Sequence, residues 1–157
     1  MNRKVRLCVA LIAVNLAFIW GNSLLPGEVS GALSDWLASL LGGGQAPETG
    51  TGLLRKLAHF SEFACLGFLL ARLAQLKGEK GHHLISLALL GGMTAACIDE
   101  SIQLLTPDRG PSLVDVWIDT CGVVTGIIAL FVIHKVKNMI SGGNNQGRNC
   151  VPCCWSL

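Results

Sequence analysis

Apolar residues form four long segments along the 157-residue chain, and short polar stretches separate them. A membrane-spanning helix needs about 20 predominantly apolar residues, and each segment reaches that length. The segments cover approximately residues 5–25, 53–76, 84–105 and 113–134. The pattern therefore predicts an all-α integral membrane protein, a four-transmembrane-helix bundle, in which residues 1–138 form a single membrane domain.

A weaker helical pattern lies in the Gly-rich stretch between the first two segments. Its apolar residues recur with helical spacing at Val29, Ala32, Leu33, Trp36, Leu37, Leu40 and Leu41. This spacing predicts an outer amphipathic helix over about residues 29–41, lying on the membrane surface or packed on the bundle as a cover. The end of the chain, residues 139–157, is predicted to be a flexible tail.

The first segment also resembles a signal peptide, because Arg3 and Lys4 precede a short apolar run. No small-x-small cleavage site follows closely after Trp20, so we expect the segment to be retained as the first span. With or without cleavage, the loop that follows is delivered to the outer side of the membrane.

Basic residues are distributed unevenly between the two sides of the predicted bundle. Nine of the twelve Lys and Arg residues fall at the N-terminus, the middle loop and the tail, namely Arg3, Lys4, Arg6, Arg72, Lys77, Lys80, Lys135, Lys137 and Arg148. Because cytoplasmic loops carry an excess of Lys and Arg, we expect a multi-pass protein with both termini in the cytoplasm. The net charge of +2 is too small to indicate a nucleic-acid partner.

Seven cysteines are present, but their positions do not suggest a disulfide framework. Cys8, Cys65, Cys97 and Cys121 each fall in a different apolar segment, and the other three crowd the tail. Secreted disulfide scaffolds place cysteines in the polar connections between elements. We therefore expect free thiols in the spans; lipid attachment or metal binding in the tail is a weaker interpretation.

Polar residues interrupt three of the four segments on the predicted outer side. They are Arg55, Lys56, His59 and Glu62 in the second, Asp99, Glu100 and Gln103 in the third, and Asp115 and Asp119 in the fourth. At about 100° per residue, the members of each group share one face of their helix. Ionisable residues inside a span are costly and mark functional sites by default. Their convergence predicts an outward-facing polar site.

The fourth segment has two glycines on the same helix face as Asp115 and Asp119, and we call this face its polar stripe. Gly122 and Gly126 are four residues apart, a spacing that lets another helix approach closely. The connection over residues 106–112 is short and contains Pro and Gly, so the third and fourth spans should be antiparallel neighbours. The stripe is therefore expected to face protein rather than lipid.

Three ordered motifs carry a family resemblance. They are Arg55-Lys56-x-x-His59-Phe60-x-Glu62-Phe63 with Leu66 and Gly67; Asp99-Glu100-x-x-Gln103; and Arg109 with Ser112, Asp115 and Asp119-Thr120-x-Gly122. Over about residues 53–132 the chain resembles VanZ-like proteins, small membrane proteins associated with glycopeptide (teicoplanin) resistance. The resemblance implies a role at the bacterial cell envelope. At the position of Asp119 the family is expected to carry Asn as often as Asp.

The side chains themselves fit an enzyme that acts on a membrane lipid or a lipid-linked cell-wall precursor. Arg55, Lys56 and Arg109 are the candidate phosphate-binding residues, because guanidinium and ammonium groups bind phosphate oxygens. The candidate catalytic residues are His59, Glu62, Asp99, Glu100, Gln103 and Asp115. His59 is the expected general acid or base, oriented by Glu62 or Asp99, and Asp115 is expected to position Arg109.

Three other interpretations stay open at this point. A divalent metal cofactor would use His59, Glu62, Asp99 and Glu100, although a second His is lacking and no standard zinc signature is matched. A non-enzymatic protein would capture a lipid head group or the antibiotic with the same basic residues. A purely structural ion-pair network is the third, but the acids outnumber the bases and would leave buried charge unpaired.

Overall fold

The computed structural model describes residues 2–26, 48–107 and 112–143, with side chains for residues 2–26, 55–107 and 112–140. Its helices are α1 (Arg3–Ser23), α3 (Glu48–Leu76), α4 (Gly81–Leu104) and α5 (Leu113–Gly143). All four contain a stretch long and apolar enough to cross a membrane, which confirms the predicted four-span helical architecture. The expected amphipathic helix over residues 29–41 and the expected phosphate ligand Arg109 lie outside the described residues.

Two helices extend further than the apolar pattern suggested. Helix α3 begins at Glu48, five residues before the predicted start of its span, and α5 continues to Gly143, nine residues past the predicted end. Hydropathy marks the part of a helix that fits the hydrocarbon, whereas backbone hydrogen bonding continues into polar sequence. Residues 139–143, expected in the flexible tail, are therefore helical.

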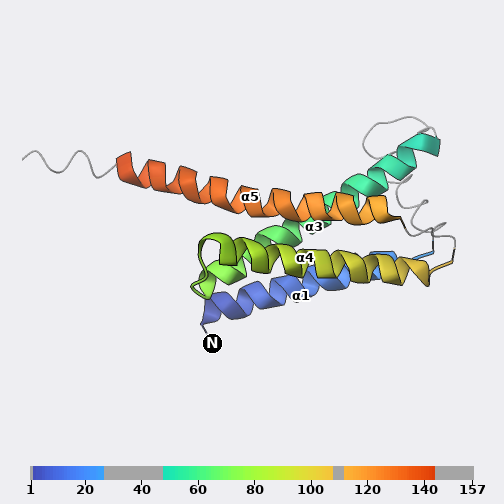
Figure 1. Ribbon diagram of the computed structural model, residues 1–157, viewed down its shortest axis with the longest axis horizontal. Helices are drawn as coiled ribbons and strands as arrows, with labels where there is room; N and C mark the ends of the chain where they lie inside the picture. Colours follow the sequence, from blue (N-terminus) through green and yellow to red (C-terminus); the bar gives the residue numbers. More distant parts are fainter. Residues whose placement is uncertain (1, 27–47, 108–111, 144–157) are drawn as a thin grey trace, which may run out of the picture.

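Helices that follow one another along the chain run antiparallel, so α3 and α5 run parallel to each other, and a short turn joins α3 to α4. Between α3 and α4, Gly78 and Gly81 have φ angles of +96° and +55°, which side chains other than Gly rarely adopt. As a result, the N-terminus of α1, the end of α3 and the start of α4 meet at one end of the bundle (Figure 1). The end of α1, the beginning of α5 and the end of α4 meet at the other, which we call the site end.

The most extensive helix contact is between α3 and α5. A Cβ atom on Gly122 would lie 2.5 Å from the carbonyl oxygen of Phe60, and one on Gly126 would overlap that of Ala64. Neither contact leaves room for a side chain, so the two backbones touch. The close approach predicted from the glycine pair is confirmed.

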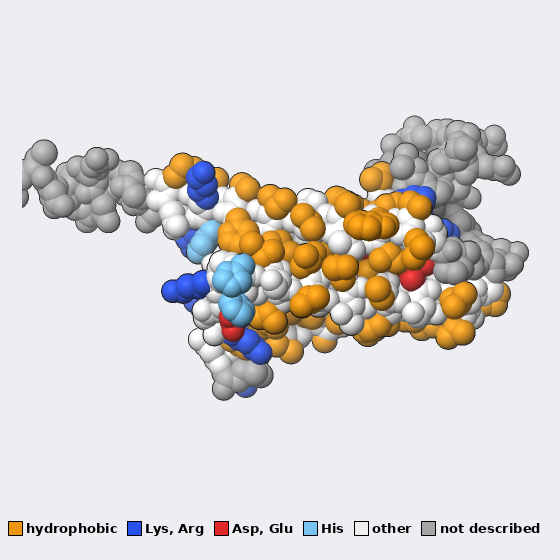
Figure 2. Space-filling model, viewed as in Figure 1, with side chains coloured by type: hydrophobic (Ala, Val, Ile, Leu, Met, Phe, Trp, Pro, Cys, Tyr) orange, Lys and Arg blue, Asp and Glu red, His pale blue; other side chains and the backbone are white. Residues whose placement is uncertain are grey.

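The bundle buries small and apolar side chains from all four helices and exposes large apolar ones. Its centre includes Ile19, Phe63, Leu66, Ala95, Ala96 and Val123. Apolar side chains cover the lateral surface, whereas Lys and Arg gather chiefly at the end that holds the N-terminus of α1 (Figure 2). An apolar outer surface with charged ends is the arrangement that a lipid bilayer requires.

Candidate functional site

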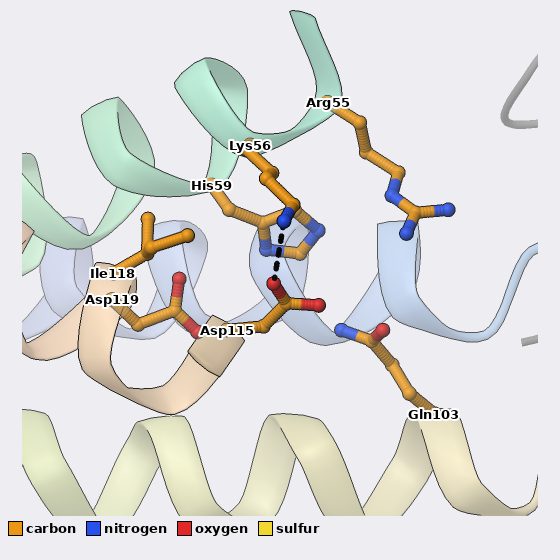
Figure 3. Close-up of a pocket in the computed structure, with 7 residues that line it drawn as sticks. All are labelled: Arg55, Lys56, His59, Gln103, Asp115, Ile118 and Asp119. Carbon is orange, nitrogen blue, oxygen red and sulfur yellow. Dashed lines mark ion pairs between the residues drawn. The ribbon is translucent and has the colours of Figure 1, made fainter. Parts of the chain in front are cut away.

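Six of the nine polar residues expected from three separate spans line one pocket at the site end, whereas Glu62, Asp99 and Glu100 are not among its described lining residues. The pocket is lined by Arg55, Lys56, His59, Gln103, Asp115, Ile118 and Asp119. Figure 3 shows α3, α4 and α5 each supplying side chains to it. Helical spacing therefore placed these residues on the correct faces, and the packing of α3 against α5 brings the faces together.

The cationic side of the pocket comes from the first turns of the α3 span. Arg55 and Lys56 both reach from α3 toward the helices opposite (Figure 3). The Nζ atom of Lys56 lies 3.6 Å from Oδ1 of Asp115, and their side chains are 45% and 19% exposed. Asp115 was expected to position Arg109, which is not described; the cation beside it is Lys56.

The imidazole of His59 lies close to the buried carboxylate of Asp99. Nδ1 of His59 lies 3.7 Å from Oδ2 of Asp99, whose side chain is fully buried. The same carboxylate oxygen accepts a hydrogen bond from Nε2 of Gln103 at 2.9 Å. Asp99 is one of the two acids expected to orient His59. Gln103 in turn fixes the orientation of that carboxylate.

Helix α1 supplies a wall of the site that the sequence did not predict. Nδ2 of Asn22 donates to Oε1 of Glu62 at 3.1 Å, and Nε2 of Gln103 donates to Oγ of Ser23 at 3.4 Å. The hydroxyl of Thr106 donates to the carbonyl oxygen of Ser23 at 3.1 Å. A signal was available, because Asn22 and Ser23 are adjacent polar residues at the end of an apolar segment, on the same side as Glu62.

Glu100 lies at the corner between α4 and α5 and is not among the described residues that line the pocket. Its buried carboxylate accepts a hydrogen bond at 3.0 Å, through Oε2, from the backbone N–H of Ser112. The hydroxyl oxygen of Ser112 accepts from the N–H of Val114 at 3.2 Å, as a helix N-cap does. Glu100 thus holds the start of α5, two turns before Asp119.

Three side chains of the site form a cluster that could bind a metal ion. His59, Asp99 and Asp119 each offer one such atom, and these atoms lie within 4.8 Å of one another. This set differs from the one expected from sequence. Glu62 and Glu100 are not in this group; Glu62 is hydrogen-bonded to Asn22, and Glu100 to Ser112.

The chemistry available in the pocket follows from these side chains. Arg55 and Lys56 are suited to bind an anion such as phosphate. His59, oriented by Asp99, is suited to give or take a proton. The seven described lining residues include no Ser, Thr or Cys, so they offer no hydroxyl or thiol nucleophile.

Comparison with known families agrees with the motifs. The VanZ/LLP1 family model matches residues 7–134, which include the pocket residues and most of the four spans. Comparisons with curated proteins and with solved structures gave no significant match. Since the family match extends over well more than half of the chain, this multi-pass membrane protein belongs to the VanZ/LLP1 family.

Proposed function

We propose that the pocket binds the phosphate-bearing head group of an envelope lipid or a lipid-linked cell-wall precursor. The protein would act in the bacterial cytoplasmic membrane and thereby contribute to resistance against teicoplanin-type glycopeptides. The observation that carries this proposal is one pocket, at the end of an apolar bundle, in which Arg55 and Lys56 face a buried polar wall. A lipid in the bilayer presents its phosphate at this level while its chains contact the apolar helix surfaces.

The two cations suit a phosphate or pyrophosphate in different ways. Arg55 carries a planar guanidinium that can donate two parallel hydrogen bonds, and Lys56 carries a compact ammonium charge. The Lys56 side chain is 45% exposed and lies 3.6 Å from its carboxylate partner Asp115, so an incoming phosphate can reach it. Both residues line the pocket, and a head group there contacts both cations at once.

The orientation of the site is part of the same proposal. The basic residues Arg3, Lys4, Arg6, Lys77 and Lys80 lie at the end of the bundle opposite the pocket. By the positive-inside rule that end is cytoplasmic. The pocket then opens outward, toward the leaflet in which wall precursors are used and glycopeptides act.

Two kinds of activity fit this pocket, and they differ in whether His59 takes part in a reaction. In an enzyme, His59 exchanges a proton with the bound lipid or with water, and Asp99 stabilises its charged form. In a binding or shielding protein the head group is captured without reaction. The described pocket lining offers no hydroxyl or thiol nucleophile, so an enzyme reaction there would use water or a group of the lipid.

Resistance measurements test the proposed role in the cell. Expression of the wild-type chain in a teicoplanin-susceptible bacterium should raise the minimal inhibitory concentration. The Arg55→Gln/Lys56→Gln variant should lose this increase, because its pocket lacks both described cations. Lys137→Gln removes the same kind of charge from an exposed position at the opposite end of α5 and should retain it. No increase with the wild-type chain would contradict the role in resistance.

His59→Gln then distinguishes reaction from capture. The variant keeps a polar side chain of similar size but cannot act as a general acid or base at neutral pH. If the protein is an enzyme, His59→Gln should still bind a polyprenyl pyrophosphate while resistance is lost. Retained resistance would exclude the catalytic alternative and leave capture as the function.

A further inference from the structure

We propose that His59, Asp99 and Asp119 bind a single divalent transition-metal ion at the base of the pocket. One ligand atom from each lies within 4.8 Å of the others, and the three residues come from α3, α4 and α5. The role of the ion rests on the proposed function, because the ion would face a bound phosphate. Binding of the ion does not depend on the proposed function and is measured without any lipid.

The geometry is close to that of a loaded site. Metal bonds of about 2.0–2.2 Å to nitrogen and oxygen place ligand atoms about 3.0–3.5 Å apart. Nδ1 of His59 and Oδ2 of Asp99 are already 3.7 Å apart. Oδ1 of Asp119 is buried and accepts no hydrogen bond from the described part of the chain. Closure of the ligand atoms by about 1–2 Å would complete the group.

Burial gives the independent reason to expect a cation. Asp99 is 0% exposed and Asp119 is 1% exposed. Buried carboxylates are costly unless a cation or hydrogen bonds compensate them. The pair between Lys56 and Asp115 and the pair between His59 and Asp99 do not include Asp119. A divalent ion would compensate both buried acids.

A neighbouring side chain orients one of the three proposed ligands by a hydrogen bond. Gln103 donates to Oδ2 of Asp99 at 2.9 Å, and Oδ1 of Asp99 is buried without a hydrogen bond from the described residues. Metal-binding carboxylates are commonly oriented in this way by a neighbouring donor. His59 and Asp119 line the pocket, so the unfilled coordination positions of an ion would face it, toward Arg55.

One nitrogen and two carboxylate ligands suit Mn²⁺ or Zn²⁺, whereas softer ions such as Cu⁺ prefer thiolates. An ion here would polarise a phosphate oxygen or a water that enters the pocket. Arg55 and Lys56 would then hold the rest of the head group. The pocket would thus recognise phosphate with a metal as well as with two side-chain cations.

Direct binding measurements test this site. The full-length protein is purified in detergent, treated with a chelator and titrated with Mn²⁺, and free Mn²⁺ is followed by electron paramagnetic resonance. Mn²⁺ is chosen because the seven cysteines prefer softer ions. The wild type should bind one equivalent, and His59→Gln, Asp99→Asn and Asp119→Asn should each lower the affinity at least about tenfold.

Glu79→Gln is the control, because it removes the same charge from the turn between α3 and α4, at the end of the bundle opposite the pocket. It should bind Mn²⁺ with wild-type affinity. Absence of a saturable site in the wild type, or equal losses in Glu79→Gln and Asp119→Asn, would overturn the proposal.

Thermal unfolding followed by circular dichroism shows which variants are folded. The Asn side chain has the same shape as Asp, so the Asp119→Asn protein should fold. If it unfolds, the Mn²⁺ affinity of His59→Gln tests the metal site instead. Titration of the same metal-free preparations with a polyprenyl pyrophosphate separates the two proposals. Lipid binding without Mn²⁺ binding refutes only the metal site, and the reverse result refutes only the proposed lipid function.

Discussion

Lys56 pairs with Asp115 in the pocket and is proposed to bind the phosphate of the ligand instead. Its ammonium lies 3.6 Å from Asp115, and the lysine side chain is 45% exposed. A partly exposed ion pair of this kind contributes only about 0–1 kcal/mol. A hydrogen bond between charged groups that replaces water contributes about 1.5–3 kcal/mol. A phosphate in the pocket should therefore displace Asp115 from Lys56 at little cost.

Lys56→Gln should lower the affinity for a soluble polyprenyl pyrophosphate by about 10–100-fold, because one charge-assisted hydrogen bond is lost. The measurement is a titration of the detergent-purified protein, with the unfolding temperature recorded for each variant. That temperature should change little, since Lys56 is half exposed. The control, Lys137→Gln on the exposed far end of α5, should bind like the wild type. Equal affinities for all three proteins would contradict phosphate binding by Lys56.

The sequence predicted which residues gather at the site more reliably than which residues pair. Helical spacing fixes the face of a side chain, and helix rise fixes its depth. Pairing depends on the approach and rotation of neighbouring helices, which neither quantity specifies. The pairing of Lys56 with Asp115 and the hydrogen bond from Asn22 to Glu62 were therefore not predicted, and the expected pairing of Asp115 with Arg109 lies outside the described residues.

The pairing of α3 with α5 positions both His59 and Asp119, and it depends on Gly126. A Cβ atom at this position would overlap the carbonyl oxygen of Ala64 and lie 2.6 Å from the N–H nitrogen of Phe68. Since these are backbone atoms, no side chain can move aside, and the two helices must separate.

Gly126→Ala should therefore destabilise the protein by about 1–3 kcal/mol, the usual cost of overpacking, or more. It should also weaken Mn²⁺ binding, because α5 carries Asp119 away from His59. Thermal unfolding in detergent and the Mn²⁺ titration measure the two effects. Gly21→Ala in α1 is the control: its Cβ would meet nothing within 4 Å, so it should be neutral or stabilising by up to about 1 kcal/mol. A Gly126→Ala protein as stable as wild type would contradict the tight helix pairing.

The sequence predicts that the four helices exist more reliably than it predicts where each helix ends. Twenty or more apolar residues can be buried in a bilayer only if the backbone satisfies its own hydrogen bonds, which favours a helix. No comparable constraint marks where the helix stops in polar sequence. This is why α5 continues to Gly143, past the apolar pattern, while the start of α5, held by Ser112 and Glu100, lies at the predicted residue.

The whole molecule is electrically asymmetric. Lys and Arg gather at the end that holds the N-terminus of α1, and the acids of the pocket lie at the site end (Figure 2). Among the described acidic residues, Glu79 in the turn between α3 and α4 is the exception. The positive-inside rule uses this asymmetry to orient the bundle, independently of any property of the pocket.

Orientation is tested with two fusions to the C-terminus of the full-length chain. A green fluorescent protein fusion should fluoresce and an alkaline phosphatase fusion should be inactive, because the rule places this terminus in the cytoplasm. The pocket, at the opposite end of α5 from that terminus, then faces outward. The reverse result, an active phosphatase and a dark fluorescent protein, would place the pocket on the cytoplasmic side. A role against antibiotics that act outside the membrane would then be excluded, whereas binding of phosphate by Lys56 and of Mn²⁺ by Asp119 would stand on their own titrations.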